Sequence, residues 1–131
     1  MKEFVFPQRH LSMFNHFSEM PVWQKAEKAM VEVYKLADKL PDYEKYSMAK
    51  QLRDAALSMP GNIAEAFGRH HAKDKSNFYY FSRGSAHECV SHLLCGVSVD
   101  HFSLTEIELA VNCCNIVIED LNKIIKALGN M

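Results

Sequence analysis

Apolar side chains recur at intervals of three and four residues along most of this chain, which is the period of an α-helix that lies against a core. The first such column, between residues 21 and 40, contains Trp23, Ala26, Met30, Val33, Ala37 and Leu40. Pro41 ends the pattern, and Asp42 is expected to cap the next helix. No strand-type alternation in the sequence competes with this interpretation.

The second helical pattern has a proline in its middle. Its apolar positions are Met48, Leu52, Ala56, Met59, Ile63 and Phe67. An interior proline costs a helix about 3 kcal/mol, so a break at Pro60 with Ser58 as a new cap is the ordinary alternative. Because the apolar positions keep their phase across Pro60, we predict one helix that is kinked there. Gly68 stands where a C-terminal cap glycine is expected.

Two further helical patterns follow. The third begins after Lys73 and Asp74 and runs to about Val99, and its wide apolar arc indicates more than one packing partner. The fourth runs from about Leu104 to Gly129. Its apolar positions form a heptad column of Ile107, Val111, Cys114, Ile118, Leu121, Ile125 and Leu128. Because the three connections are short, the sequence predicts an all-α, antiparallel up-down-up-down four-helix bundle over residues 21–131.

Residues 1–20 show no helical period and form a separate N-terminal arm in this interpretation. Their apolar content is too high for a purely solvated tail: Phe4, Val5, Phe6, Phe14 and Phe17. We therefore expect an arm that docks either on its own bundle or on a neighbouring subunit.

Composition narrows the class of protein. A chain of 131 residues is the length of one domain, and its formal net charge of −1 argues against a dedicated nucleic-acid or membrane-surface protein, although it allows a local basic patch. The apolar run near the N-terminus is too short for a secretory signal, and no apolar run in the sequence approaches the length of a membrane span. The four cysteines all lie in helical patterns, which indicates reduced thiols in a cytoplasmic protein.

Five segments, taken in order, resemble a known family. They are VWQKA (residues 22–26), VYKL (33–36), LPDYEKYSM (40–48), QLRDAALSMPGNIAEAFGR (51–69) and GSAHE (84–88). Together they resemble the 23S ribosomal RNA intervening-sequence protein family, and they are similar to the related accessory variability proteins of diversity-generating retroelements. The resemblance covers about residues 20–128.

This resemblance implies a four-helix bundle that assembles into a homopentamer and has no known enzymatic activity. The retroelement relatives are thought to bind nucleic acid and a reverse transcriptase through basic surfaces. The chain departs from the family pattern at Ala66, where glycine is usual, and at Asp54, where a basic residue is common. Its slightly acidic balance also differs from the basic relatives.

Several polar residues on the second and third helices are candidates for a buried network that repairs the helix around Pro60. Proline leaves the carbonyl near Ala56 without its helical donor, and buried carbonyls need partners. A ligand site or an acid catalyst is the alternative for these residues. The candidates for the network are Arg53, Ser58, Asn62, Glu65, Arg69 and Glu88.

The connection between the second and third helices is rich in basic side chains, which are able to contact phosphates. A solvated loop is the alternative, and it is favoured because the segment lacks interleaved exposed aromatic residues. The candidate nucleic-acid-binding residues are Arg69, His70, His71, Lys73, Lys75 and Arg83.

A further cluster contains His87, Cys89, His92 and Cys95, which are metal-ligand types spaced along one helix. A closed zinc site needs four ligands in a tetrahedral array, which one helix rarely supplies. We therefore expect no metal site and no cofactor, and we interpret these residues as part of a core or a subunit interface.

The sequence thus predicts a non-enzymatic, homo-oligomeric helical scaffold, a pentamer by resemblance, that binds RNA, DNA or a protein partner and does not insert into membranes. Two alternatives remain at this point. One is a metal-binding or enzymatic bundle that uses the His87–Cys95 cluster, and the other is a structural partner protein without affinity for nucleic acid.

Overall fold

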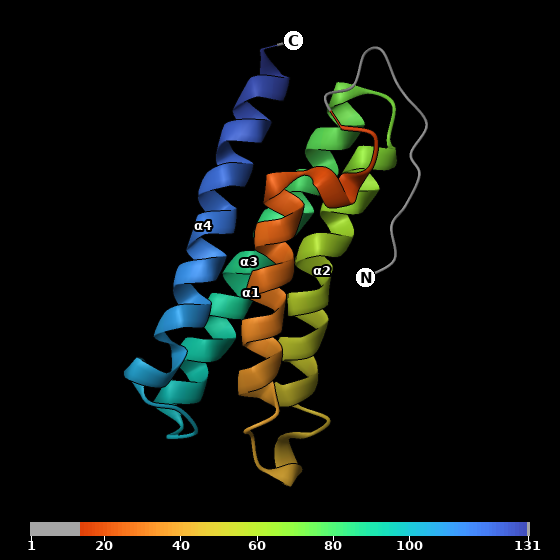
Figure 1. Cartoon of the computed structure of the whole chain (residues 1–131). Coiled ribbons are helices and arrows are strands. Elements are labelled where there is room, and N and C mark those ends of the chain that lie inside the picture. Colours follow the sequence, from red (N-terminus) through yellow and green to blue (C-terminus); the bar gives the residue numbers. More distant parts are fainter. Residues whose placement is uncertain (1–13, 131) are drawn as a thin grey trace.

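The computed structural model describes residues 14–130, and every regular element in that range is helical. Four long helices follow one another: α1 (Pro21–Ala37), α2 (Met48–Gly68), α3 (Ala72–Ser98) and α4 (Leu104–Gly129). They run alternately down and up, and α4 returns to lie beside α1 (Figure 1). The predicted all-α, up-down-up-down four-helix bundle is therefore confirmed.

Helix α2 continues without interruption through Pro60. Pro60 itself is buried, and so are Leu52, Met59 and Ile63 on the same helix. Since burial of one continuous apolar face outweighs the single lost hydrogen bond, the helix does not restart at Ser58. The prediction that one helix spans the proline is confirmed.

Two expected caps are wrong. Asp42 begins a short 3-10 helix, η2 (Asp42–Glu44), and α2 starts six residues later at Met48. Gly68 is the last residue of α2, but no glycine among the described residues has a positive φ. The chain leaves α2 through Arg69 in extended conformation, so the left-handed turn that favours glycine is not used here.

The turn between α3 and α4 contains the single described non-glycine residue with positive φ, Asp100 at 64°. Aspartate tolerates this left-handed conformation better than most residues. Ser103 then caps α4, because its hydroxyl accepts from the Glu106 N–H while the Glu106 carboxylate accepts from the Ser103 N–H. These local contacts fix where α4 begins.

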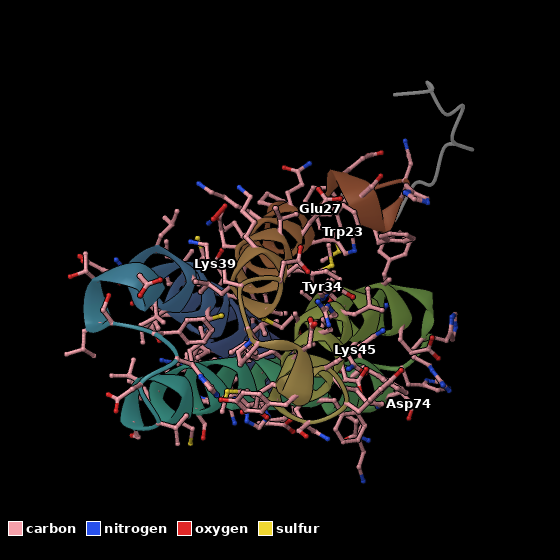
Figure 2. All side chains as sticks on the ribbon, turned by 90° about the horizontal axis from the view of Figure 1, so that it is seen from below. Trp23, Glu27, Tyr34, Lys39, Lys45 and Asp74 are labelled. Carbon is pink, nitrogen blue, oxygen red and sulfur yellow. The ribbon has the colours of Figure 1, made fainter. Side chains whose placement is uncertain are left out.

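The core is made by one face of each helix. Ala26 and Val33 of α1, Leu93 of α3 and Leu121 of α4 are fully buried. Figure 2, which views the molecule from below, shows the helices around this shared interior, with Glu27 and Lys39 pointing outward. No helix within residues 14–130 combines the length and the apolar character that crossing a bilayer requires.

The part of the predicted arm that the structure describes packs onto the bundle. A 3-10 helix, η1 (Phe17–Glu19), precedes α1, and the Phe17 ring lies 5.4 Å from Trp23 of α1 and 6.5 Å from Phe67 of α2, centroid to centroid. Residues 14–20 are therefore continuous with the bundle core. The predicted docking of residues 1–13 lies outside the described residues.

Candidate functional site

The basic connection between α2 and α3 lies at the end of the bundle where η1 and the C-terminus of α4 are also found (Figure 1). Arg69 follows α2 directly, and its Nη2 atom is 2.8 Å from the Glu65 Oε1 atom one turn earlier. Its guanidinium carbon is 4.5 Å from the centroid of the Phe78 ring of α3. Arg69 thus pairs with Glu65 of α2 while its guanidinium lies over the Phe78 ring of α3.

Lys75 has a structural role at this connection. Its Nζ atom donates to the carbonyl oxygens of Ala66, at 3.1 Å, and Phe67, at 3.2 Å. These belong to the last turn of α2, where carbonyls lack helical donors and attract cations. Burial lowers the pKa of the Lys75 ammonium. Lys75 therefore joins α3 to the C-terminal end of α2, and these two carbonyl groups occupy its ammonium.

Arg83 belongs to another part of the surface. Its Nη1 atom donates to the Asn122 Oδ1 atom of α4 at 2.8 Å, and its guanidinium lies 4.7 Å from the centroid of the Tyr80 ring. Arg83 therefore bridges α3 and α4. The structure does not gather it with the α2–α3 connection.

His70, His71 and Lys73 stand exposed at the connection, and so does Arg69 despite its contacts with Glu65 and Phe78. The two imidazole rings meet edge to face, with centroids 5.3 Å apart. No ion pair among residues 14–130 involves Lys73. Arg69, Lys75 and Arg83 each have partners for their charged groups, so fewer unpaired cations stand at the connection than the sequence suggested.

Hydrogen bonds around Pro60 link α2 to α3. The Asn62 Nδ2 atom donates to the Ser58 carbonyl at 2.9 Å and contacts the Ser58 hydroxyl at 2.8 Å, and that hydroxyl lies 2.8 Å from the Ser85 Oγ atom of α3. One turn away, the fully buried Ser82 donates to the Met59 carbonyl at 2.8 Å. Small hydroxyl residues thus let α2 and α3 approach closely beside the proline.

The other predicted network residues have separate partners. Arg53 pairs with Asp38, just after α1, at 2.7 Å, and Glu65 pairs with Arg69. The Glu88 carboxylate lies 3.6 Å from the His92 Nε2 atom, which has no hydrogen-bond partner in the described structure. The six predicted residues therefore divide into separate contacts. The predicted network did not include Ser82 and Ser85, because spacing along α3 alone does not show which groups of α2 their hydroxyls meet.

The His/Cys cluster on α3 does not converge on a common point. Cys89 is buried against Cys114 of α4, while His87 and Cys95 are exposed. A hydrogen bond with Cys114, together with burial, raises the pKa of the Cys89 thiol. A raised thiol pKa disfavours the thiolate that metal binding or nucleophilic attack requires. Within residues 14–130, no group of three or more His, Cys, Asp or Glu side chains is arranged to hold a metal ion.

The fold and the site together define a helical bundle whose polar contacts serve packing between helices. A family model described as 23S rRNA-intervening sequence protein matches residues 18–123. The chain therefore belongs to the 23S rRNA-intervening sequence protein family. Among curated proteins, no significant match to the sequence is found.

A solved structure supports the fold. It is the crystal structure of a protein with unknown function from the S23 ribosomal protein family of Bacteroides thetaiotaomicron. It superposes with a TM-score of 0.74 at 24% sequence identity, and the match covers 80% of this chain and 98% of that chain. At this identity, the similarity concerns the arrangement of the helices.

Proposed function

We propose that this protein is a non-enzymatic, cytoplasmic scaffold that assembles into a homo-oligomer and binds a macromolecular partner. The observation that carries the proposal is the exposure of large apolar side chains on the outer faces of the bundle. Leu57 of α2 is 56% exposed, and Phe81 and Leu94 of α3 are 57% and 46% exposed. Exposed apolar area of this kind usually marks a protein interface.

The α2–α3 face is well suited to a second copy of the chain. Leu57 precedes Ser58 on α2 and Phe81 lies one turn before Ser85 on α3, and the hydroxyls of Ser58 and Ser85 are 2.8 Å apart. Large side chains beside small ones form a surface on which another helix is able to pack closely. The family resemblance implies a pentamer as the resulting assembly.

The test is the mass of the native protein, measured by light scattering after size exclusion. We expect a mass of several chains for the natural sequence, and monomers for Phe81→Lys and Leu94→Lys, since a buried lysine at an interface is costly. Ser91→Lys, an exposed polar position on the same helix, is the matched control and should keep the oligomer. A monomeric natural protein would contradict the proposal, and unchanged masses of both variants would contradict the assignment to α3.

A nucleic acid is the second candidate partner, and the exposed His70, His71 and Lys73 support it. Weak contacts of these three side chains with phosphates become a substantial site when they repeat around an assembly, because the contacts then act together. Binding of an RNA oligonucleotide should weaken steeply as salt increases, and Lys73→Gln should reduce that dependence. Binding that is insensitive both to salt and to Lys73→Gln would leave a protein partner as the remaining candidate.

A metal-binding or enzymatic bundle was the alternative from sequence. It draws no support from the described residues, because Cys89 packs against Cys114 in the interior while His87 and Cys95 lie at the surface. Elemental analysis of protein expressed with supplemented metals tests it directly, and a stoichiometric metal would revive it.

A further inference from the structure

An apolar cleft of about 270 Å³ opens between the start of α1 and the last turns of α4. Five of the six side chains that line it are apolar, and the sixth, Asp120, is held 2.7 Å from the Lys25 Nζ atom of α1. The lining residues are Phe14, Met20, Pro21, Val22, Asp120 and Ile124. An apolar hollow of this kind favours an apolar side chain over water.

The sequence before Phe14 contains a segment suited to this cleft. Phe14, the first described residue, is part of the lining, so the preceding segment leaves from the rim of the cleft. That segment contains three consecutive apolar residues, Phe4, Val5 and Phe6. Eight residue steps from Phe6 to Phe14 span up to about 27 Å when extended, which is more than enough to return to the cleft.

The sequence around these three residues favours an extended backbone. Pro7 fixes its own φ and biases Phe6 toward extended backbone, which sends side chains alternately to opposite sides. The polar residues Gln8, Arg9 and His10 provide a solvated link between Phe6 and the rim.

We propose that residues 4–6 fold back in the same chain and place Phe4 or Phe6 in the cleft between α1 and α4. A short tether gives an attached segment an effective concentration in the millimolar range, so the segment competes well against free partners for this cleft. Docking would bury the apolar side chains of the segment against those that line the cleft.

Limited proteolysis with trypsin at Arg9 tests the docking. Trypsin cuts at Arg9 only when the segment has left the cleft. The natural protein should therefore be cut at Arg9 about tenfold more slowly than the double variant Phe4→Ser/Phe6→Ser. Gln8→Ser, which changes the link and not the apolar residues, is the matched control and should behave as the natural protein. Equal cleavage rates in all three proteins would overturn the proposal.

A second pair of variants changes the cleft. Ile124→Asp should expose Arg9 to trypsin as strongly as the arm variant does, whereas Lys123→Asp, at an exposed neighbouring position, should not. Circular dichroism reports whether Ile124→Asp folds, and the arm variants decide the question if it does not. A folded Ile124→Asp protein that keeps full protection of Arg9 would contradict the assignment to this cleft.

Photo-cross-linking separates docking in the same chain from docking on a neighbour. Phe4→p-benzoylphenylalanine protein is prepared once with natural nitrogen and once with ¹⁵N, and the two preparations are unfolded and refolded together. After irradiation, mass spectrometry identifies the cross-links to peptides of α1 and α4 and the isotope class of each partner. Cross-links within one isotope class are expected. Cross-links between the classes would overturn docking in the same chain, and an absence of cross-links to α1 and α4 would overturn the cleft as the site.

Discussion

The ring of Phe102 fills the space in which a side chain of Gly96 would stand. A Cβ atom at Gly96 would lie 2.5 Å from the Phe102 Cδ2 atom, and the Gly96 carbonyl accepts from the His101 N–H at 2.8 Å. The turn after α3 therefore folds back onto the last turns of the same helix. Phe102, only 5% exposed, is thereby brought into the core.

Gly96→Ala should destabilise the protein, because the Phe102 ring must move to admit the new methyl group. Overpacking a buried site costs about 1–3 kcal/mol, which exceeds the gain of about 1 kcal/mol in helix propensity. Urea unfolding measures the difference. Gly84→Ala on the same helix has open space and should stabilise or leave stability unchanged, so a loss in both variants would refute the steric explanation.

Lys75→Met should cost about 0.5–1.5 kcal/mol of stability, because the Ala66 and Phe67 carbonyls lose their donor at the end of α2. Methionine retains most of the aliphatic packing of the lysine stem. Lys73→Met, at an exposed position two residues earlier, is the control, and thermal unfolding of both variants is the measurement. Equal effects would mean that the carbonyl contacts contribute nothing.

His101 and Glu44 join the two connections at the lower end of the bundle in Figure 1, with the His101 Nε2 and Glu44 Oε2 atoms 2.9 Å apart. His101→Ala should lower the free energy of unfolding by about 1–2 kcal/mol, since a partly buried carboxylate loses a donor. A double-mutant cycle with Glu44→Gln measures the coupling between the two side chains. A coupling energy near zero would show that the contact is incidental.

Tyr79, which is 5% exposed, should make stability fall at alkaline pH. Burial raises the pKa of its phenol above the usual value of about 10. The unfolded chain therefore releases this proton first, so the stabilisation is intact below about pH 10 and is lost as pH rises through the folded-state pKa.

Tyr79→Phe should reduce the loss of stability between about pH 9 and about pH 11, measured by urea unfolding at each pH. Tyr43→Phe removes a phenol that is 76% exposed and is the matched control. The burial argument fails if Tyr79→Phe shows the same alkaline loss as the natural protein.

Helix α4 shows how far the sequence pattern reached. The predicted column correctly contained Ile107, Cys114 and Leu121, which are buried. Its members Val111 and Ile118 are only half-buried. Ala110, Cys113 and Val117 are buried instead, because α4 packs against α1 as well as α3 and its buried arc widens toward α1. The heptad pattern correctly indicated which side of α4 is buried, and the neighbouring helices determine how many residues on that side are buried.

The sequence by itself determined the four helices, their order and the continuity of α2 across Pro60. These follow from apolar periodicity and short connections, which are local properties of the chain. Only the tertiary structure decided which cations remain exposed. Lys75 reaches the carbonyls of α2, and Arg83 reaches Asn122, 39 residues later. Such partners come from distant segments, and spacing along one helix carries no information about them.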